Sequence, residues 1–118
     1  MAVLRITPNL LCDDPARMAA FYRDFFGLDI VMALDFITTS AATAHQQVPQ
    51  ISMATEGGSG TELPVLSIEV DDLDALHDTM RAQEIPCAYG PVNEPWGVRR
   101  LFLRDPAGYL INVLEHRN

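Results

Sequence analysis

The chain has 118 residues, a formal net charge of −8 and 48% hydrophobic residues, which suffices for a single domain, residues 1–118, with a real core. The acidic charge argues against nucleic acid, whose phosphates it would repel, and weakly favours cationic ligands. No apolar run reaches transmembrane length and the first residues lack a signal-peptide pattern, so the sequence predicts a cytoplasmic protein with no membrane partner.

The first half of the chain has the pattern of a strand, a helix and three further strands. A strand is expected over 3–12, and Asp14 and Pro15 suit the N-cap and first position of a helix that runs to about Phe26 and is closed by Gly27. That helix carries an apolar stripe, interpreted as core: Met18, Phe21, Tyr22 and Phe25. Strands are then expected over 28–34, 36–40 and 48–55, with a polar loop containing His45 before the last.

After a flexible, glycine-rich connector, 56–61, the same pattern starts again. A strand over 65–70 is followed by a helix that Asp72 caps and that ends near Gln83, with Leu73, Leu76 and Met80 along one side. A short strand over 86–89 and a loop over 90–96 come next. Two alternating runs, 98–104 and 109–115, then form a β-hairpin around the turn Asp105-Pro106-Ala107-Gly108.

The two halves therefore resemble an internal repeat. Aligning Asp13 and Asp14 with Asp71 and Asp72 also aligns further pairs, namely Cys12 with Val70, Met18 with Leu76 and Arg23 with Arg81. We expect an α+β domain built from two βαβββ units, about 1–56 and 61–118. Cys12 and Cys87 lack metal-like spacing and are interpreted as buried, reduced thiols rather than nucleophiles.

Alternation along the last hairpin assigns its side chains to two faces. One face is plainly apolar and predicts core: Leu101, Leu103, Ile111 and Val113. The other mixes a cation, an aromatic ring, an amide and aliphatic groups, which favours the wall of a cavity: Arg100, Phe102, Leu110, Asn112 and Leu114.

This repeat, with FYRDFFGL in the first helix and RDPAGYLINVLEH at the end, resembles the vicinal oxygen chelate superfamily. That superfamily includes glyoxalase I, extradiol dioxygenases, fosfomycin resistance enzymes and bleomycin-type resistance proteins. The last segment looks most like small bacterial proteins of the bleomycin-resistance type. The resemblance implies a curved mixed sheet around a cleft, with the helices outside.

Metal enzymes of the superfamily have four inward ligand positions, which the resemblance places at Thr7, Ser52, Val65 and Asn112. These side chains are poor donors for a divalent metal, and His45, His77 and His116 are not expected to replace them. Phe102 stands where extradiol dioxygenases can have a catalytic tyrosine, and a phenyl ring cannot transfer a proton. We therefore expect no metal, no cofactor and no catalytic residue.

What remains is a pocket for a small molecule, with an apolar and aromatic lining and a few polar groups. Its expected ligand-binding residues are Thr7, Asn9, Ser52, Val65, Ser67, Glu69, Trp96, Arg100, Phe102, Leu110 and Asn112, with Leu11 and Leu114 beside them. Trp96 is predicted to stack on a ligand or to cap the barrel end. Arg100 is predicted to contact a ligand or to pair with Glu69, and Glu94 to lie on the surface.

The leading hypothesis is a metal-independent protein that binds a drug-like or aromatic ligand without covalent chemistry, as in antibiotic resistance. The alternative is an enzyme, either a glyoxalase-like lyase or isomerase or a dioxygenase relative, with a displaced metal site. A third is an interaction domain whose cleft is filled by its own side chains. The resemblance also implies a homodimer, and the connector would permit an exchange of βαβββ units.

Overall fold

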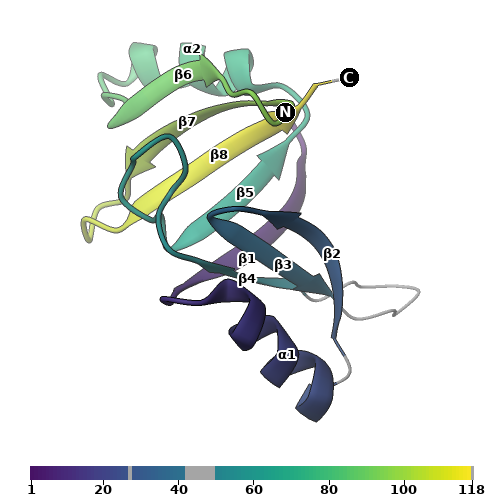
Figure 1. Ribbon diagram of the computed structural model, residues 1–118. Helices are drawn as coiled ribbons and strands as arrows, with labels where there is room; N and C mark the ends of the chain where they lie inside the picture. Colours follow the sequence, from purple (N-terminus) through teal and green to yellow (C-terminus); the bar gives the residue numbers. More distant parts are fainter. Residues whose placement is uncertain (27, 42–49, 118) are drawn as a thin grey trace. The chain divides into compact units, whose positions relative to one another are not determined.

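The computed structural model describes residues 1–26, 28–41 and 50–117, and shows a strand, a helix and three strands, twice in succession (Figure 1). The elements are β1 (Val3–Leu11), α1 (Pro15–Phe26), β2 (Asp29–Leu34), β3 (Ile37–Ala41), β4 (Gln50–Ala54), β5 (Leu66–Val70), α2 (Leu73–Ala82), β6 (Tyr89–Asn93), β7 (Val98–Arg104) and β8 (Leu110–His116). This order confirms the α+β class and the repeated βαβββ pattern.

The chain divides into two compact units, and β1 contributes to both. Thr7–Leu63 form the N-terminal unit, and Met1–Ile6 together with Pro64–Asn118 form the C-terminal unit. The cleft expected between the two repeats concerns their mutual arrangement and stays a prediction.

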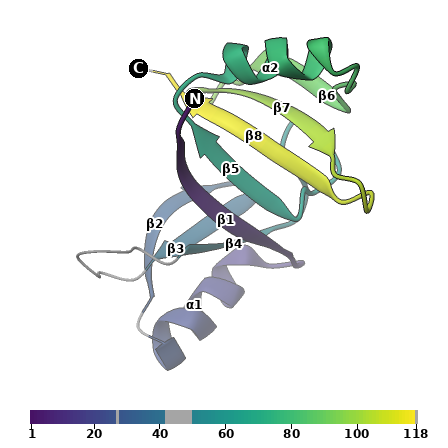
Figure 2. The ribbon, with the colours of Figure 1, turned by 180° about the vertical axis from the view of Figure 1, so that it is seen from behind.

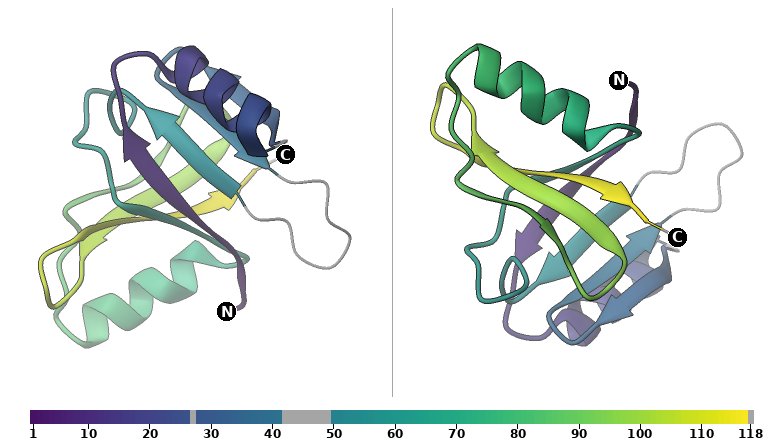
Figure 3. Two further views of the ribbon diagram at one scale, coloured as in Figure 1. Left: turned by 90° about the horizontal axis from the view of Figure 1, so that it is seen from below. Right: turned by 90° about the horizontal axis from the view of Figure 1, so that it is seen from above.

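The N-terminal unit contains a sheet in the order β2-β3-β4-β1, with α1 beside it (Figure 3). β1 runs parallel to β4, and β3 is antiparallel to β4 and β2. The carboxylate of Asp14 accepts a hydrogen bond from the backbone N–H of Arg17 at 3.2 Å, as expected for the N-cap. Phe21 is 48% exposed, so its assignment to the core was wrong. Gly27, His45 and the side chain of Phe25 lie outside the described residues.

The glycine-rich connector, 56–61, belongs to the N-terminal unit and forms a hydrogen-bonded turn. The backbone N–H of Gly57 donates to the Thr61 carbonyl at 2.8 Å, and that of Gly60 donates to the Glu56 carboxylate at 2.9 Å. Glycine content alone indicated a flexible connector, and it could not show that the Glu56 carboxylate and the Thr61 carbonyl accept hydrogen bonds within it.

In the C-terminal unit, α2 packs on one side of a sheet in the order β5-β8-β7-β6 (Figure 2). The helix is capped as expected, because Asp72 accepts a hydrogen bond from the backbone N–H of Ala75 at 3.0 Å. Six buried side chains form the core between helix and sheet: Val70, Leu73, Met80, Leu101, Ile111 and Val113. Leu103 packs against them, so the apolar face predicted for the last hairpin is confirmed.

The two strands of that hairpin are β7 and β8, which pair from Val98 opposite His116 to Arg104 opposite Leu110. The turn between them is closed by a 2.9 Å hydrogen bond from the backbone N–H of Gly108 to the Asp105 carbonyl. The Asp105 carboxylate also accepts the N–H of Ala107 at 3.0 Å. Both bonds match the turn chemistry that the sequence predicts.

The strand before the hairpin lies later in the chain than predicted, over Tyr89–Asn93 rather than 86–89. Gly90-Pro91 suggested a loop, but here these residues form a bulge in an edge strand, where proline is tolerated. The register shifts between Tyr89, which lies opposite Phe102, and Val92, which lies opposite Arg100. The bulge thereby places Tyr89 beside the middle of β7.

Substitution of Gly90 tests how tightly this bulge is packed. Its φ is +75°, and a Cβ atom there would lie 2.6 Å from the Arg100 carbonyl oxygen. Gly108 is the matched control, because its φ is +90° but a Cβ there would meet nothing within 4 Å. We expect Gly108→Ala to lower the free energy of unfolding by about 1 kcal/mol and Gly90→Ala by at least about 2 kcal/mol more.

The measurement is urea unfolding followed through the fluorescence of Trp96, the single tryptophan. Equal losses in the two variants would contradict a tightly packed bulge.

Candidate functional site

The site is built on the face of the C-terminal sheet that is turned away from α2, called here the polar face. Strand alternation places on it Ser67, Glu69, Arg100, Phe102, Leu110, Asn112 and Leu114. Register arranges them in rows across the strands, because directly paired residues point to the same side. The mixed second face predicted for the hairpin is therefore present, and Arg100, Phe102, Leu110 and Asn112 on it are buried.

The first row runs from Ser67 on β5 through Asn112 and Phe102 to Tyr89 on β6. The Asn112 amide donates a hydrogen bond to the Ser67 hydroxyl at 3.1 Å. Asn112 is only 9% exposed, yet its Oδ1 has no hydrogen-bond partner among the described residues. A buried acceptor without a donor costs free energy, and such a group in a native structure calls for an explanation.

The next row contains Arg100, whose guanidinium is surrounded by three aromatic rings. Its central carbon lies 4.7 Å from the ring centroid of Phe102, 4.9 Å from that of Trp96 and 5.3 Å from that of Tyr89. The Tyr89 and Phe102 rings also pack together, with centroids 5.0 Å apart. Arg100 is only 3% exposed, so the three rings contact a guanidinium that is largely desolvated.

Glu94 supplies the counter-charge of Arg100. Its Oε2 accepts hydrogen bonds from Arg100 Nε at 2.8 Å and lies 2.5 Å from a terminal nitrogen. The Tyr89 hydroxyl donates to the same carboxylate at 3.2–3.3 Å. Glu94 is 8% exposed, so its expected place on the surface was wrong. The loop carries it inward because Arg100 requires a buried partner.

Glu69 was the expected partner of Arg100 and instead binds Arg5 and His116. Arg5 Nε donates to one carboxylate oxygen at 2.7 Å, and His116 Nδ1 lies 2.9 Å from the other. Burial alone would raise the pKa of Glu69, but the hydrogen bonds and charges of His116 and Arg5 outweigh it and lower that pKa below 4.5. Sequence reasoning missed His116, although its even spacing from Asn112 and Leu114 places it on the polar face.

The remaining predicted residues lie in both units. Thr7, Asn9 and Ser52 belong to the N-terminal unit, where Asn9 pairs in register with Ser52. The Ser52 hydroxyl, 3% exposed, shares a 2.7 Å hydrogen bond with Thr39. Val65 precedes β5 and is 41% exposed. The other eight predicted residues belong to the C-terminal unit: Val65, Ser67, Glu69, Trp96, Arg100, Phe102, Leu110 and Asn112.

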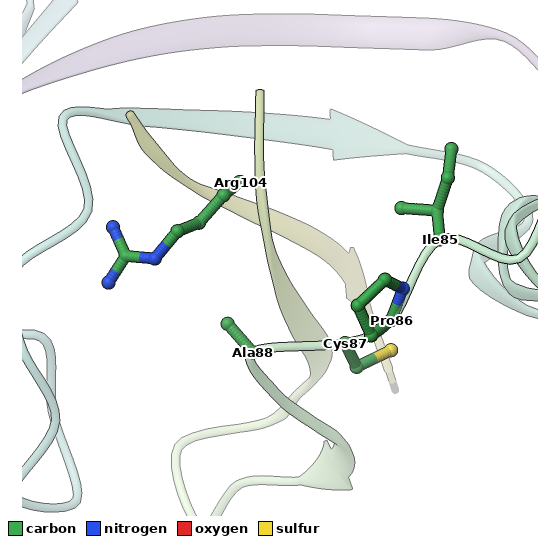
Figure 4. Close-up of a pocket in the computed structure, with 5 residues that line it drawn as sticks. All are labelled: Ile85, Pro86, Cys87, Ala88 and Arg104. Carbon is green, nitrogen blue, oxygen red and sulfur yellow. The ribbon is translucent and has the colours of Figure 1, made fainter. Parts of the chain in front are cut away.

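A separate open hollow of about 250 Å³ lies where the chain leaves α2 for β6 (Figure 4). It is lined by Ile85, Pro86, Cys87, Ala88 and Arg104. Burial raises the pKa of the Cys87 thiol, which disfavours the thiolate, so its interpretation as a structural thiol is consistent with its surroundings. Cys12 is also free, and burial likewise raises its pKa.

The family model of the Glyoxalase/Bleomycin resistance protein/Dioxygenase superfamily matches residues 3–113. The chain belongs to this superfamily. No curated protein matches the chain significantly.

Solved structures share the fold at low identity. A structure described as an NAD-dependent benzaldehyde dehydrogenase from Legionella pneumophila is 13% identical, with a TM-score of 0.72, and covers 96% of this chain and 100% of that one. A variant of Streptomyces coelicolor methylmalonyl-CoA epimerase with 2-nitronate-propionyl-CoA is 17% identical, with a TM-score of 0.70 and coverage of 99% and 100%. A superfamily member from Vibrio splendidus 12B01 is 15% identical, with a TM-score of 0.64 and coverage of 98% and 99%.

The side chains at the four positions that the resemblance assigns to the superfamily's metal ligands do not suit a divalent metal ion. Thr7 and Ser52 offer hydroxyls, Asn112 a neutral amide and Val65 no donor, whereas such sites are built from imidazole, carboxylate or thiolate. Across residues 1–26, 28–41 and 50–117, no three His, Cys, Asp or Glu side chains are grouped so as to hold a metal ion. Within the same ranges, every helix is too short or too polar to cross a membrane.

The lowered pKa of Glu69 predicts a contribution to stability that depends on pH. Because this carboxyl binds its proton more weakly in the folded than in the unfolded chain, the contribution is complete above pH 4.5 and is lost as the pH falls through the lowered value. Between pH 6 and pH 3, we expect wild type to lose about 1 kcal/mol more stability than Glu69→Gln.

The measurement is urea unfolding at each pH. Asp78→Asn is the control, because Asp78 pairs with Arg81 on the exposed surface of α2 and should behave as wild type does. Parallel losses in wild type and Glu69→Gln would contradict the prediction.

Proposed function

We propose that this protein is a metal-independent small-molecule binding protein, which holds a drug-like or aromatic ligand without covalent chemistry, as in antibiotic resistance by sequestration. The observation that carries this proposal is the buried Oδ1 of Asn112, which has no hydrogen-bond partner among the described residues. A ligand N–H or O–H group would satisfy this acceptor.

The surroundings of Asn112 support a ligand with a large apolar part. Leu110 and Leu114 flank it along β8, and Ser67 holds its amide from β5. An apolar wall with one or two fixed polar groups is typical of sites that orient a small molecule. The neutral donors at the metal-ligand positions of the superfamily support binding rather than metal chemistry.

A metal-free enzyme is the second candidate, and the contact between Glu69 and His116 favours it. The carboxylate orients the imidazole through Nδ1, in the arrangement used by histidines that transfer protons. The side chain of His116 is 50% exposed, so solvent and small molecules can reach it. A His116→Asn variant that abolished a turnover activity would favour this candidate over simple sequestration.

Binding is tested by isothermal titration against a panel of glycopeptide and polycyclic antibiotics. For any ligand that binds, we expect Asn112→Ala to weaken the affinity about tenfold or more, because the hydrogen bond to Oδ1 is lost. Asn93→Ala is the matched control: Asn93 is an exposed amide on β6, the edge strand of the same sheet, and its removal should leave the affinity unchanged. Absence of micromolar binding across the panel would contradict the proposal.

Metal content is a separate test. Because the matching positions lack suitable donors, we expect elemental analysis of protein purified without chelators to find far less than one metal ion per chain. We also expect ligand affinity to be unchanged by EDTA. Stoichiometric nickel, zinc, iron or manganese would contradict a metal-independent function.

A further inference from the structure

The side chains around Arg100 form a cage of the kind that binds cations, and the cation inside it is the Arg100 guanidinium itself. Three aromatic rings and one carboxylate surround the guanidinium, and both charged side chains are only 4% exposed. Phe102, one of the three rings, lies directly opposite Asn112 on the neighbouring strand. The cage and the unpartnered acceptor are therefore neighbours on one sheet face.

We propose that Glu94 determines the charge selectivity of this face, because it neutralises Arg100 and so prevents the face from binding anionic ligands. The inference rests on the proposed function and specifies its substrate class: a neutral or cationic molecule with an N–H or O–H donor. An arginine beside a ligand site ordinarily attracts carboxylates, sulfonates and phosphates. Here the strongest hydrogen-bonding directions of the guanidinium already meet a carboxylate.

The geometry makes Glu94 a fixed counter-ion. Besides its two contacts with Arg100, the Glu94 carboxylate accepts the Tyr89 hydroxyl at 3.2–3.3 Å. Its backbone N–H donates to the Val98 carbonyl at 2.8 Å, and its carbonyl accepts the Gly97 N–H at 3.3 Å, which anchors the turn between β6 and β7. An anionic ligand would have to displace a carboxylate that is held at both ends, which costs more than displacing water.

Removal of the Glu94 charge should reverse this selectivity. In Glu94→Gln, the amide keeps the shape and can still accept a hydrogen bond, but the negative charge that lies against the buried guanidinium is lost. Removal of a charge from a buried ion pair is costly, and an anionic ligand would relieve that cost. Arg100 then becomes a binding site for the negative group of a ligand.

The experiment compares two dyes with one aromatic skeleton, the neutral N-phenyl-1-naphthylamine and its anionic relative 1-anilinonaphthalene-8-sulfonate. Dissociation constants come from dye fluorescence and from energy transfer from Trp96, with near-ultraviolet circular dichroism as the check of native packing. We expect Glu94→Gln to raise the affinity for the anionic dye relative to the neutral dye by about tenfold or more.

Asp74→Asn is the control, because it removes one negative charge from the same unit at an exposed ion pair with Arg99. We expect its ratio of affinities to change less than about threefold, as is usual for screened charges. The double variant Glu94→Gln/Arg100→Met should return the ratio to within about threefold of wild type, because no buried cation remains.

Equal ratios in folded Glu94→Gln and Asp74→Asn would overturn the inference, as would a raised ratio that persists in the double variant. If Glu94→Gln packs poorly, the rise in its melting temperature on addition of sodium sulfate is measured instead. A larger rise than in Asp74→Asn supports the inference, and an equal rise overturns it. If wild type binds neither the neutral dye nor any member of the antibiotic panel, the proposed function is contradicted. The inference about Glu94 is still tested in that case, by comparing the affinity of the anionic dye for Glu94→Gln with its affinity for the double variant.

Discussion

The buried ion pair between Arg100 and Glu94 is the constraint on which the candidate site depends. Arg100 points away from the helix-covered core, into a position with only 3% exposure, and a cation there is unstable without a partner. The carboxylate of Glu94, the hydroxyl of Tyr89 and the ring of Trp96 all gather around it. The turn that carries Glu94 and the bulge that carries Tyr89 are thus fixed by one charge in the middle of β7.

This constraint gives the two faces of the C-terminal sheet different roles. The side under α2 is held by non-directional apolar packing, with Leu101 and Val113 at its centre, and its chemistry could change with little effect on specificity. The polar face is held by directional contacts, namely ion pairs and hydrogen bonds of fixed geometry. Such contacts give specificity, so the distinctive properties of this chain are concentrated on the polar face.

The sequence alone could predict whatever depends on local pattern. The alternation along β7 and β8, the Asp105–Gly108 turn and the cap at Asp72 follow from neighbouring residues, and each was predicted. The partner of Arg100 could not be predicted in this way: the sequence suggested Glu69 and placed Glu94 on the surface, whereas Glu94 is the partner. The choice depends on the bulge at Gly90 and on Arg5 and His116, which already neutralise Glu69. Such contacts join segments far apart in the chain, which local patterns do not describe.

Membership of the superfamily fixes the framework and leaves the chemistry to individual side chains. At the position that the resemblance assigns to the last metal ligand, Asn112 offers a neutral amide oxygen, which lacks the negative charge that would hold a metal ion. Arg100 carries a positive charge, and Glu94 cancels it in place. On the proposed function, we expect this part of the face to discriminate between ligands by hydrogen-bond direction and apolar fit rather than by charge. Such a face suits the retention of an uncharged molecule better than the stabilisation of the developing charge on which catalysis usually depends.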